Sequence, residues 1–325
     1  MATVKEVVHV LDLLTKPGIE ALPPKVAVPA FQLRRLLGTK NIVAVGVGEK
    51  VTDGKGTGRL ALRFYVRRKV KLNNLKASEA VPPAVHPALA QTNAVVPTDV
   101  IVLGQLRLDA AIKPGDSLGN IRVSAGTFGA LVRHNRQLEV LSNSHILARS
   151  GKGRKGDKIL SPAKDDGGKA PDDVVALLTR FLKFVVGGAF VNKADCAVAA
   201  PVAGRLQDFR SAIPGVGVPK GTIAPKRGMK IVKVGRTTGK TTGVIEDIHF
   251  RVVFPYPGVG KVGYVDQVLC SRYSAPGDSG SLVLDKQTKR AVGLHFASAP
   301  EGSVFSPIEN VLKALRVTLV TTAIG

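Results

Sequence analysis

Residues 275–284 read Ala-Pro-Gly-Asp-Ser-Gly-Ser-Leu-Val-Leu, which sets a serine between glycines directly ahead of an apolar run. Glycine allows a tight turn that other residues would forbid, because it has no Cβ. Such a turn can direct two backbone N–H groups at one point, where they would stabilise an oxyanion. The pattern is typical of a hydrolase nucleophile presented ahead of a strand, and it makes Ser279 the candidate.

A serine hydroxyl needs a general base, for which a neutral histidine is the usual group. Of the six histidines, His145 fits this role best. It follows the apolar run 138–141 and lies in Ser-Asn-Ser-His-Ile-Leu-Ala at 142–148, where a polar cap ahead of a short helix would fix the imidazole. The others are His9 in the N-terminal arm, His86 between prolines, His134 in a polar turn, His249 in a strand, and His295 after the nucleophile.

The candidate acid is Asp195, which directly precedes the apolar run 196–199. An acid in that place is partly buried, and burial is costly unless a partner takes its hydrogen bonds. Asp172 and Asp173 are rivals, but they are typical of a helix start. Taken singly, His145 and Asp195 are best interpreted as structural residues. Their order with Ser279 changes this interpretation, because His–Asp–Ser is the chymotrypsin-type order, whereas an α/β-hydrolase needs its acid and histidine after the serine.

Four segments carry a family resemblance. Residues 277–281 (Gly-Asp-Ser-Gly-Ser), 142–145 (Ser-Asn-Ser-His) and 195–198 (Asp-Cys-Ala-Val) look like the signature blocks of trypsin-like, chymotrypsin-fold serine peptidases. The blocks are most similar to those of bacterial, non-secreted trypsin-like peptidases that carry a small N-terminal domain, which are distant relatives of the plant Narrow Leaf type. Residues 235–239 (Gly-Arg-Thr-Thr-Gly) also resemble that group. The resemblance covers roughly residues 40–318.

The resemblance implies a mainly β, chymotrypsin-like double β-barrel with the site in the cleft between the barrels. His145 and Asp195 would come from the first barrel and Ser279 from the second. The N–H groups of Gly277 and Ser279 would form the oxyanion hole. The implied activity is a serine endopeptidase that acts on proteins or peptides through an acyl-enzyme, without a cofactor or metal. The alternative is a catalytically weak protease-fold scaffold that binds nucleic acid or acidic proteins.

Asp278 departs from the pattern of many animal members, in which a cleavage creates an Ile-Val-type N-terminus that pairs with this acid. No Ile-Val-Gly-Gly block precedes residue 126. We therefore expect another partner for Asp278, with Arg272 as a candidate, and do not expect activation by that cleavage.

The strand expected at 292–298 would line the primary specificity pocket in this family. A histidine at His295 resembles the glutamate-specific branch, so the resemblance assigns substrate binding to Tyr273, His295 and Ser298 and favours acidic P1 residues. The alternative is a core histidine satisfied by a backbone carbonyl.

The net charge of +23 implies attraction to anionic partners or, more plainly, a solvated basic surface. Nucleic-acid binding is disfavoured, because no aromatic residues interleave with the basic segment 210–240 and no nucleic-acid motif is present. A phosphate-loop interpretation of 235–241 has the wrong spacing, so we expect a strand–turn–strand there. No Cys/His cluster has zinc spacing.

Three segments are expected along the chain: a helical arm at 1–38, a small α+β domain at 39–112, and a protease domain at 113–325 with barrels at about 113–208 and 215–318. The apolar stripe of the arm makes a homo-oligomer a reasonable expectation. A short helix is expected at 172–184. No apolar run is long enough for a membrane helix, no signal peptide is recognisable, and the two cysteines, Cys196 and Cys270, read as buried thiols, so we expect a cytoplasmic protein.

Overall fold

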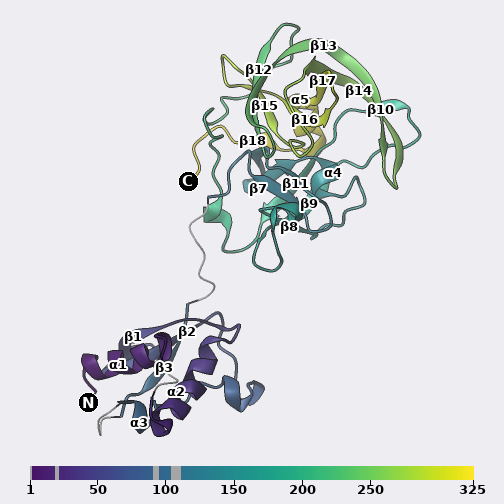
Figure 1. The fold of residues 1–325 in the computed structure, drawn as a ribbon. Coiled ribbons are helices and arrows are strands. Elements are labelled where there is room, and N and C mark those ends of the chain that lie inside the picture. The colour runs from purple at the N-terminus through teal and green to yellow at the C-terminus, as the bar shows by residue number, and fades with distance from the viewer. Residues whose placement is uncertain (1, 19–21, 91–94, 104–110) are drawn as a thin grey trace. The chain divides into compact units, whose positions relative to one another are not determined.

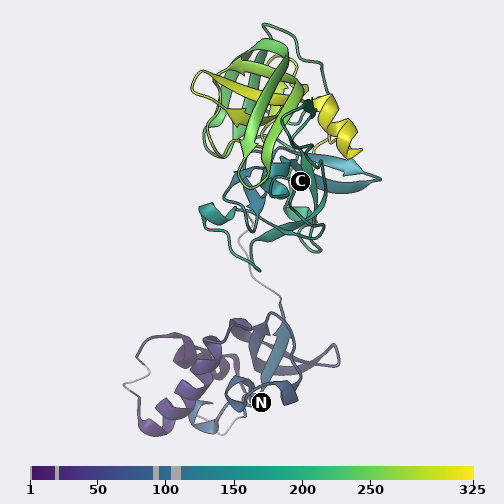
Figure 2. The ribbon, with the colours of Figure 1, turned by 90° about the vertical axis from the view of Figure 1, so that its right-hand side faces the viewer.

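A computed structural model describes residues 2–18, 22–90, 95–103 and 111–325. The chain divides into two compact units, Met1–Leu108 (unit 1) and Asp109–Gly325 (unit 2), drawn in Figures 1 and 2. None of the described helices is long and apolar enough to cross a membrane.

Unit 1 is a three-stranded sheet covered by helices, with β1 and β2 antiparallel and β2 and β3 parallel. The apolar stripe of α1, which includes Val7, Val10 and Leu14, packs in one core with Leu62 and Phe64 of β2. The N-terminal helices are therefore part of the core of this unit. Its elements are α1 (Val4–Thr15), α2 (Pro24–Leu37), β1 (Ile42–Thr52), β2 (Lys55–Val66), the 3-10 turns Leu72–Asn74 and Ala77–Glu79, α3 (Pro87–Ala90) and β3 (Thr98–Val102).

The first half of unit 2 is an eight-stranded curled sheet in the order β18-β6-β7-β11-β9-β8-β4-β5. Its last strand, β18 (Thr318–Leu319), returns from the C-terminus to pair with β6. Its other elements are β4 (Ser117–Asn120), β5 (Gly126–Thr127), β6 (Ala130–His134), β7 (Gln137–Ser142), α4 (Ser144–Leu147), β8 (Lys158–Leu160), the 3-10 turn Lys164–Asp166, β9 (Val174–Phe181), β11 (Ala197–Pro201) and the 3-10 turn Leu206–Asp208.

The second half is a sheet in the order β10-β14-β13-β12-β15-β16-β17, which an additional pairing of β14 with β17 closes into a barrel. Figure 2 shows these green and yellow strands curling around one another. Its elements are β10 (Phe190–Asn192), β12 (Lys230–Gly235), β13 (Gly239–Tyr256), β14 (Gly260–Ser271), β15 (Leu282–Asp285), β16 (Ala291–Ser298), β17 (Gly302–Pro307) and α5 (Ile308–Leu315). The expected mainly β, chymotrypsin-like double barrel is confirmed.

The two barrels share one apolar core, and the candidate residues lie at its margin. Ala194 and Cys196, which flank Asp195, pack in the same cluster as Leu282 and Leu294 of the second barrel. This core immobilises the chain on both sides of Asp195 and just after Ser281. It therefore fixes the backbone that carries the side chains of Asp195 and Ser279.

Strand β10 links the barrels more directly. It precedes Asp195 in the chain, yet it pairs in parallel with β14 of the second barrel. The Asn192 amide donates to the Gly263 carbonyl at 2.9 Å, and the Gln267 amide donates to the Lys193 carbonyl at 3.0 Å. The segment that leads into Asp195 is thus held by the second barrel.

Two local expectations have clear outcomes. The helix expected at 172–184 is wrong: Val174–Phe181 is strand β9, which pairs with β8 and β11 and buries Val175, Ala176 and Leu178. Valine and threonine favour a strand once partners are available on both sides, and no helical stripe competes. The strand–turn–strand expected around 235–239 is confirmed by the pairing of β12 with β13. Cys196 and Cys270 are both buried free thiols.

Candidate active site

His145 lies in the first turn of α4, directly after β7 ends at Ser142. The N-cap residue, Asn143, makes no side-chain capping bond. Asp195 caps the helix instead: its Oδ1 accepts hydrogen bonds from Ser144 N at 2.6 Å and His145 N at 3.2 Å. A carboxylate at a helix N-terminus satisfies amides that have no partner within the helix. The fold of this short helix therefore brings His145 and Asp195 together.

The side chains of His145 and Asp195 also bond to each other. His145 Nδ1 lies 2.5 Å from Asp195 Oδ2, and Tyr256 OH donates to the same oxygen at 2.9 Å. The Asp195 side chain is fully buried, whereas that of His145 is 20% exposed. Since an ionised carboxylate only accepts hydrogen bonds, the proton belongs on His145 Nδ1. Nε2 is then the free basic nitrogen.

Ser279 lies in a turn flanked by Gly277 and Gly280, whose φ values are +98° and +97°. The turn packs against the first barrel: Thr127 N donates to Ser279 O at 2.8 Å, and Thr127 Oγ1 donates to Gly277 O at 2.9 Å. A Cβ on Gly280 would overlap Ser142 Oγ. Because Ser142 ends the strand that leads to His145, this contact brings the serine turn to the same end of the first barrel.

The polar groups of Gly277 and Ser279 make few hydrogen bonds within the described residues. Neither Gly277 N nor Ser279 N donates a hydrogen bond to any of them. Ser279 Oγ donates to the Phe296 carbonyl at 3.4 Å, a long and weak bond. No hydrogen bond joins His145 Nε2 to Ser279 Oγ in the described part of the chain. The arrangement holds a paired histidine, a serine half-exposed on its turn, and two unpaired amides beside that serine.

Asp278 is bound by Lys233, not by the expected Arg272. Lys233 Nζ lies 2.9 Å from Asp278 Oδ2, and both side chains are fully buried. Arg272 is exposed and instead donates to the Pro300 carbonyl at 3.4 Å. The sequence did carry a signal for Lys233, which is the one charged residue inside the apolar stretch of β12 between Ile231 and Val234. A charge in such a place requires a buried partner.

Further donors surround the Asp278 carboxylate. Thr238 Oγ1 donates at 2.6 Å, and the amides of Thr237, Thr238 and Ala275 donate at 2.9, 3.1 and 3.1 Å. Burial raises the pKa of Asp278, but the hydrogen bonds from Thr238 and Lys233 outweigh it and lower that pKa below its ordinary value. Burial lowers the pKa of Lys233, and its bond to Asp278 opposes that change. The serine turn is therefore anchored from its own barrel.

The structure brings Tyr273, His295 and Ser298 together. His295 is fully buried on β16, with Nδ1 at 3.1 Å from Tyr273 OH and Nε2 at 3.4 Å from Ser298 Oγ. Burial lowers the pKa of His295 to about 3, so the ring is neutral near pH 7. Ser274 Oγ adds a further hydroxyl, 2.8 Å from Ser298 Oγ. The cluster joins one neutral imidazole to three hydroxyl groups.

Two other features lie outside this constellation. Within the described ranges, no group of histidine, cysteine, aspartate and glutamate side chains could hold a metal ion.

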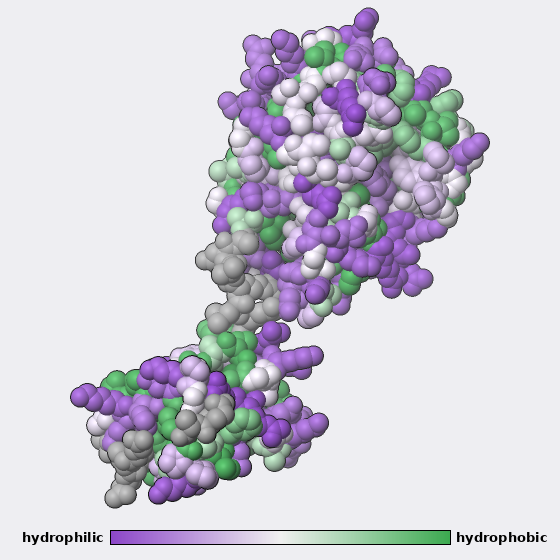
Figure 3. All heavy atoms as spheres, in the orientation of Figure 1, coloured by the Kyte–Doolittle hydropathy of each residue, from purple (hydrophilic) through white to green (hydrophobic). Residues whose placement is uncertain are grey.

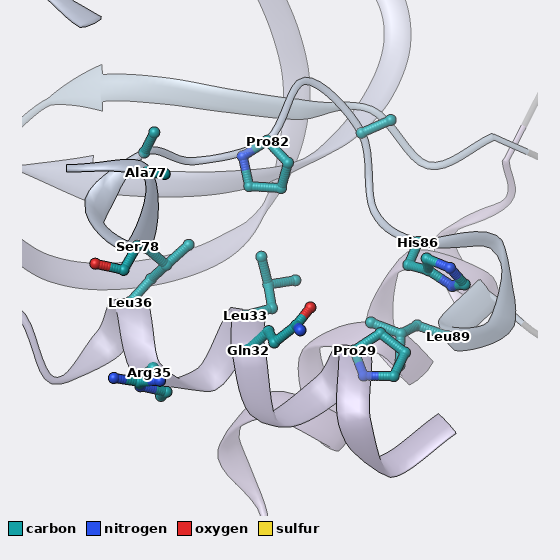
Figure 4. Close-up of a pocket in the computed structure, with 12 residues that line it drawn as sticks. Pro29, Gln32, Leu33, Arg35, Leu36, Ala77, Ser78, Pro82, His86 and Leu89 are labelled. Carbon is teal, nitrogen blue, oxygen red and sulfur yellow. The ribbon is translucent and has the colours of Figure 1, made fainter. Parts of the chain in front are cut away.

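Unit 1 contains a pocket of about 520 Å³ between α2 and the segment 77–89. Figure 4 shows it lined by Leu33, Leu36 and Leu89, with the polar groups of Gln32, Arg35, Ser78 and His86 around them.

The fold of this chain is similar to solved structures of bacterial serine proteases, whereas its sequence matches no family model and no curated protein. Among solved structures, protease A of Thermobifida fusca is 17% identical with a TM-score of 0.47, over 66% of this chain and 100% of its own. A chymotrypsin of Cellulomonas bogoriensis is 18% identical with a TM-score of 0.46, over 65% of this chain and 100% of its own. A glutamic acid-specific serine protease, described as using a histidine triad in substrate binding, is 18% identical with a TM-score of 0.46, over 64% and 100%.

Proposed function

We propose that this chain is a serine endopeptidase, in which Ser279 is the nucleophile, His145 the general base and Asp195 the group that orients His145. The observation that carries the proposal is the 2.5 Å bond between His145 Nδ1 and the fully buried Asp195. A buried carboxylate that fixes one tautomer of a partly exposed histidine leaves Nε2 ready to accept a proton. A purely structural histidine would not need its second nitrogen free beside a serine turn.

In the proposed reaction, Ser279 Oγ attacks the carbonyl carbon of the scissile peptide bond while its proton passes to His145 Nε2. The C–N bond then breaks, and the amine leaves with the proton from His145. Water attacks the acyl-enzyme ester, gives a proton to the same nitrogen, and releases the acid as Ser279 regains its hydrogen. Asp195 stabilises the imidazolium that forms in each half of this cycle.

The N–H groups of Gly277 and Ser279 are the proposed oxyanion hole, because both belong to the nucleophile's turn and neither donates to another of the described residues. Ser279 Oγ must exchange its 3.4 Å bond to Phe296 for one to His145. Catalytic hydrogen bonds are often long in the absence of substrate and tighten when substrate binds.

Labelling with a fluorophosphonate probe tests the proposal. The wild-type protein should be labelled covalently, and Ser279→Ala should lose the label. Asp195→Asn should react at least about a hundredfold more slowly, because the tautomer is no longer fixed. Ser124→Ala, which removes an exposed hydroxyl, is the control and should react like wild type. A folded wild-type protein that is never labelled would favour the alternative of a protease-fold scaffold for acidic partners.

The specificity that we propose for this enzyme is an acidic P1 residue. Tyr273, His295 and Ser298 offer an imidazole and hydroxyls that can bond a carboxylate, and the net charge of +23 favours acidic substrates. A carboxylate beside His295 would favour the protonated ring, against the effect of burial. Peptide-library profiling should give a higher kcat/KM for Glu than for Gln at P1, and His295→Gln should reduce that ratio. Dominant cleavage after Arg, Lys or Phe would exclude the preference.

A further inference from the structure

Tyr256 joins the second barrel to the acid of the first. It ends β13, and its hydroxyl donates to Asp195 Oδ2 at 2.9 Å. This oxygen is also the one that binds His145 Nδ1. The ring of Tyr256 lies 6.2 Å from the ring of His145, measured between centroids. One phenol from the second barrel thus shares a carboxylate oxygen with the histidine.

The direction of the hydrogen bond follows from the chemistry of the three groups. Asp195 accepts only, so Tyr256 must donate to it. Tyr264 OH lies 3.0 Å from Tyr256 OH and supplies the next donor in the chain. Burial, together with the charge of Asp195, raises the pKa of Tyr256 well above its ordinary value, so the phenol keeps its proton. The order of donation is therefore Tyr264 to Tyr256 to Asp195.

The backbone around Tyr256 is firmly held, so its hydroxyl has a defined position. Its ring packs 4.9 Å from that of Phe184, which belongs to the loop before β10. Lys152, in the loop that follows α4, donates to the carbonyl of Gly258 at the tip of the β13–β14 hairpin. Both contacts reach the hairpin from segments of the first barrel that flank His145 and Asp195. These two contacts restrict the movement of the hairpin end that carries the Tyr256 hydroxyl.

We propose that Tyr256 is a positioning residue of the active site, through which the β13–β14 hairpin fixes the orientation of Asp195 and, through it, the imidazole of His145. The inference rests on the proposed serine peptidase function. Oδ1 of Asp195 is occupied by two amides of α4, and Oδ2 is shared by His145 and Tyr256. Without the phenol, this buried carboxylate loses one of its donors, and Oδ2 is then held by His145 alone.

Tyr256→Phe is the test, because it removes the hydroxyl and keeps the ring packed on Phe184. We expect kcat to fall about tenfold with KM nearly unchanged, since a bond to a charged group that orients the base is lost. The acid limb of the kcat/KM profile should move in Tyr256→Phe, because Asp195, the carboxylate that binds His145, has lost a donor, whereas the substitution removes no contact of His295, the other ionisable group near His145. Tyr264→Phe is the matched control and should stay within about threefold of wild type, because Tyr256 can still donate to Asp195.

A second measurement is independent of turnover. The chemical shift of the His145 Nδ1 proton, observed by proton NMR, should change in Tyr256→Phe, because the carboxylate oxygen that this proton binds has lost a donor, and it should stay near its wild-type value in Tyr264→Phe. Wild-type turnover and an unmoved proton in Tyr256→Phe would overturn the inference. An equal loss of kcat in Tyr264→Phe would overturn it as well, since the effect would then belong to the aromatic cluster. A proton that moves in a protein without peptidase activity would support the positioning role while rejecting the proposed function.

Discussion

Lys233 and Asp278 form an ion pair that is completely excluded from solvent, with Nζ and Oδ2 at 2.9 Å. Asp278 directly precedes Ser279, so the pair fastens the nucleophile's turn to the core of the second barrel. The anchor comes from inside the chain, and forming it requires no new N-terminus.

Lys233→Met should therefore lower the free energy of unfolding by about 3–5 kcal/mol, because it leaves a buried carboxylate without its counter-charge. Labelling of Ser279 should fall at the same time. The double variant Lys233→Met/Asp278→Asn removes both charges and should regain part of the stability in urea unfolding. A Lys233→Met protein as stable as wild type would show that the four other hydrogen bonds to the Asp278 carboxylate suffice without the pair.

Gly277→Ala should remove the label almost entirely. The glycine has φ +98°, and a Cβ there would overlap Thr237 Oγ1 and lie 2.9 Å from Arg236 Nη1. Displacing this residue moves one proposed oxyanion donor, and loss of such a donor costs about a hundredfold or more in kcat. The control is Gly228→Ala, which has φ +77° and open space around the position of its Cβ. It carries the same kind of backbone strain, so retained labelling there isolates the effect at Gly277.

His295 should make the protein less stable as the pH falls. Burial lowers its folded pKa to about 3 from an ordinary value of 6.5. Below pH 6.5 the unfolded chain takes up a proton that the folded protein refuses until about pH 3, so stability declines across this window by an amount on the order of a few kcal/mol. Asp278 adds to the loss at lower pH: its folded pKa lies below 3.8, so its contribution is present above that value and fades as the folded carboxylate is protonated.

Urea unfolding between pH 7 and pH 4 measures this decline. His295→Gln should flatten it, because the amide has no proton to gain. His249→Gln is the control, since the His249 side chain is 77% exposed, and it should leave the slope as in wild type. If the free energy of unfolding fell equally with pH in all three proteins, His295 would not be a cause of the acid sensitivity.

Ionic strength should act on acidic substrates more than on neutral ones. Hydrophilic residues cover much of the visible face of unit 2 in Figure 3, and the chain carries a net charge of +23. Raising the salt from about 0.01 M to about 1 M shortens the screening length roughly tenfold and should lower kcat/KM for a glutamate-containing peptide severalfold. A matched glutamine peptide should change little. If kcat/KM fell equally for both peptides, salt would be acting on the enzyme itself and not on its association with an acidic substrate.

The sequence was sufficient for the parts of the site that lie in short contiguous blocks. The blocks around His145, Asp195 and Ser279 each carry their own local pattern, and their order along the chain selected a double barrel. Strand β9 was missed because its residues lack clean alternation, and its two partner strands, which decide its conformation, lie elsewhere in the chain.

Tyr256 and Lys233 were missed for a related reason. Each acts on its partner across a long stretch of chain, and neither belongs to a recognisable motif. Lys233 could have been suspected from its apolar strand, but its pairing with Asp278 rather than with another acid depends on how β12 and β15 sit side by side. Tyr256 reaches Asp195 only because the β13–β14 hairpin is long enough to do so, a property of the register and not of any single residue.

Strand β10 has a consequence for how the protein is made. Because β14 is the strand that pairs with β10 in the described part of the chain, a nascent chain that ends at Asp195 does not yet contain the strand on which β10 docks. Pairings so distant in sequence form late in folding. A growing polypeptide on the ribosome therefore lacks β14, the strand that holds the segment leading into Asp195. We expect that segment to become ordered only after the second barrel has been synthesised.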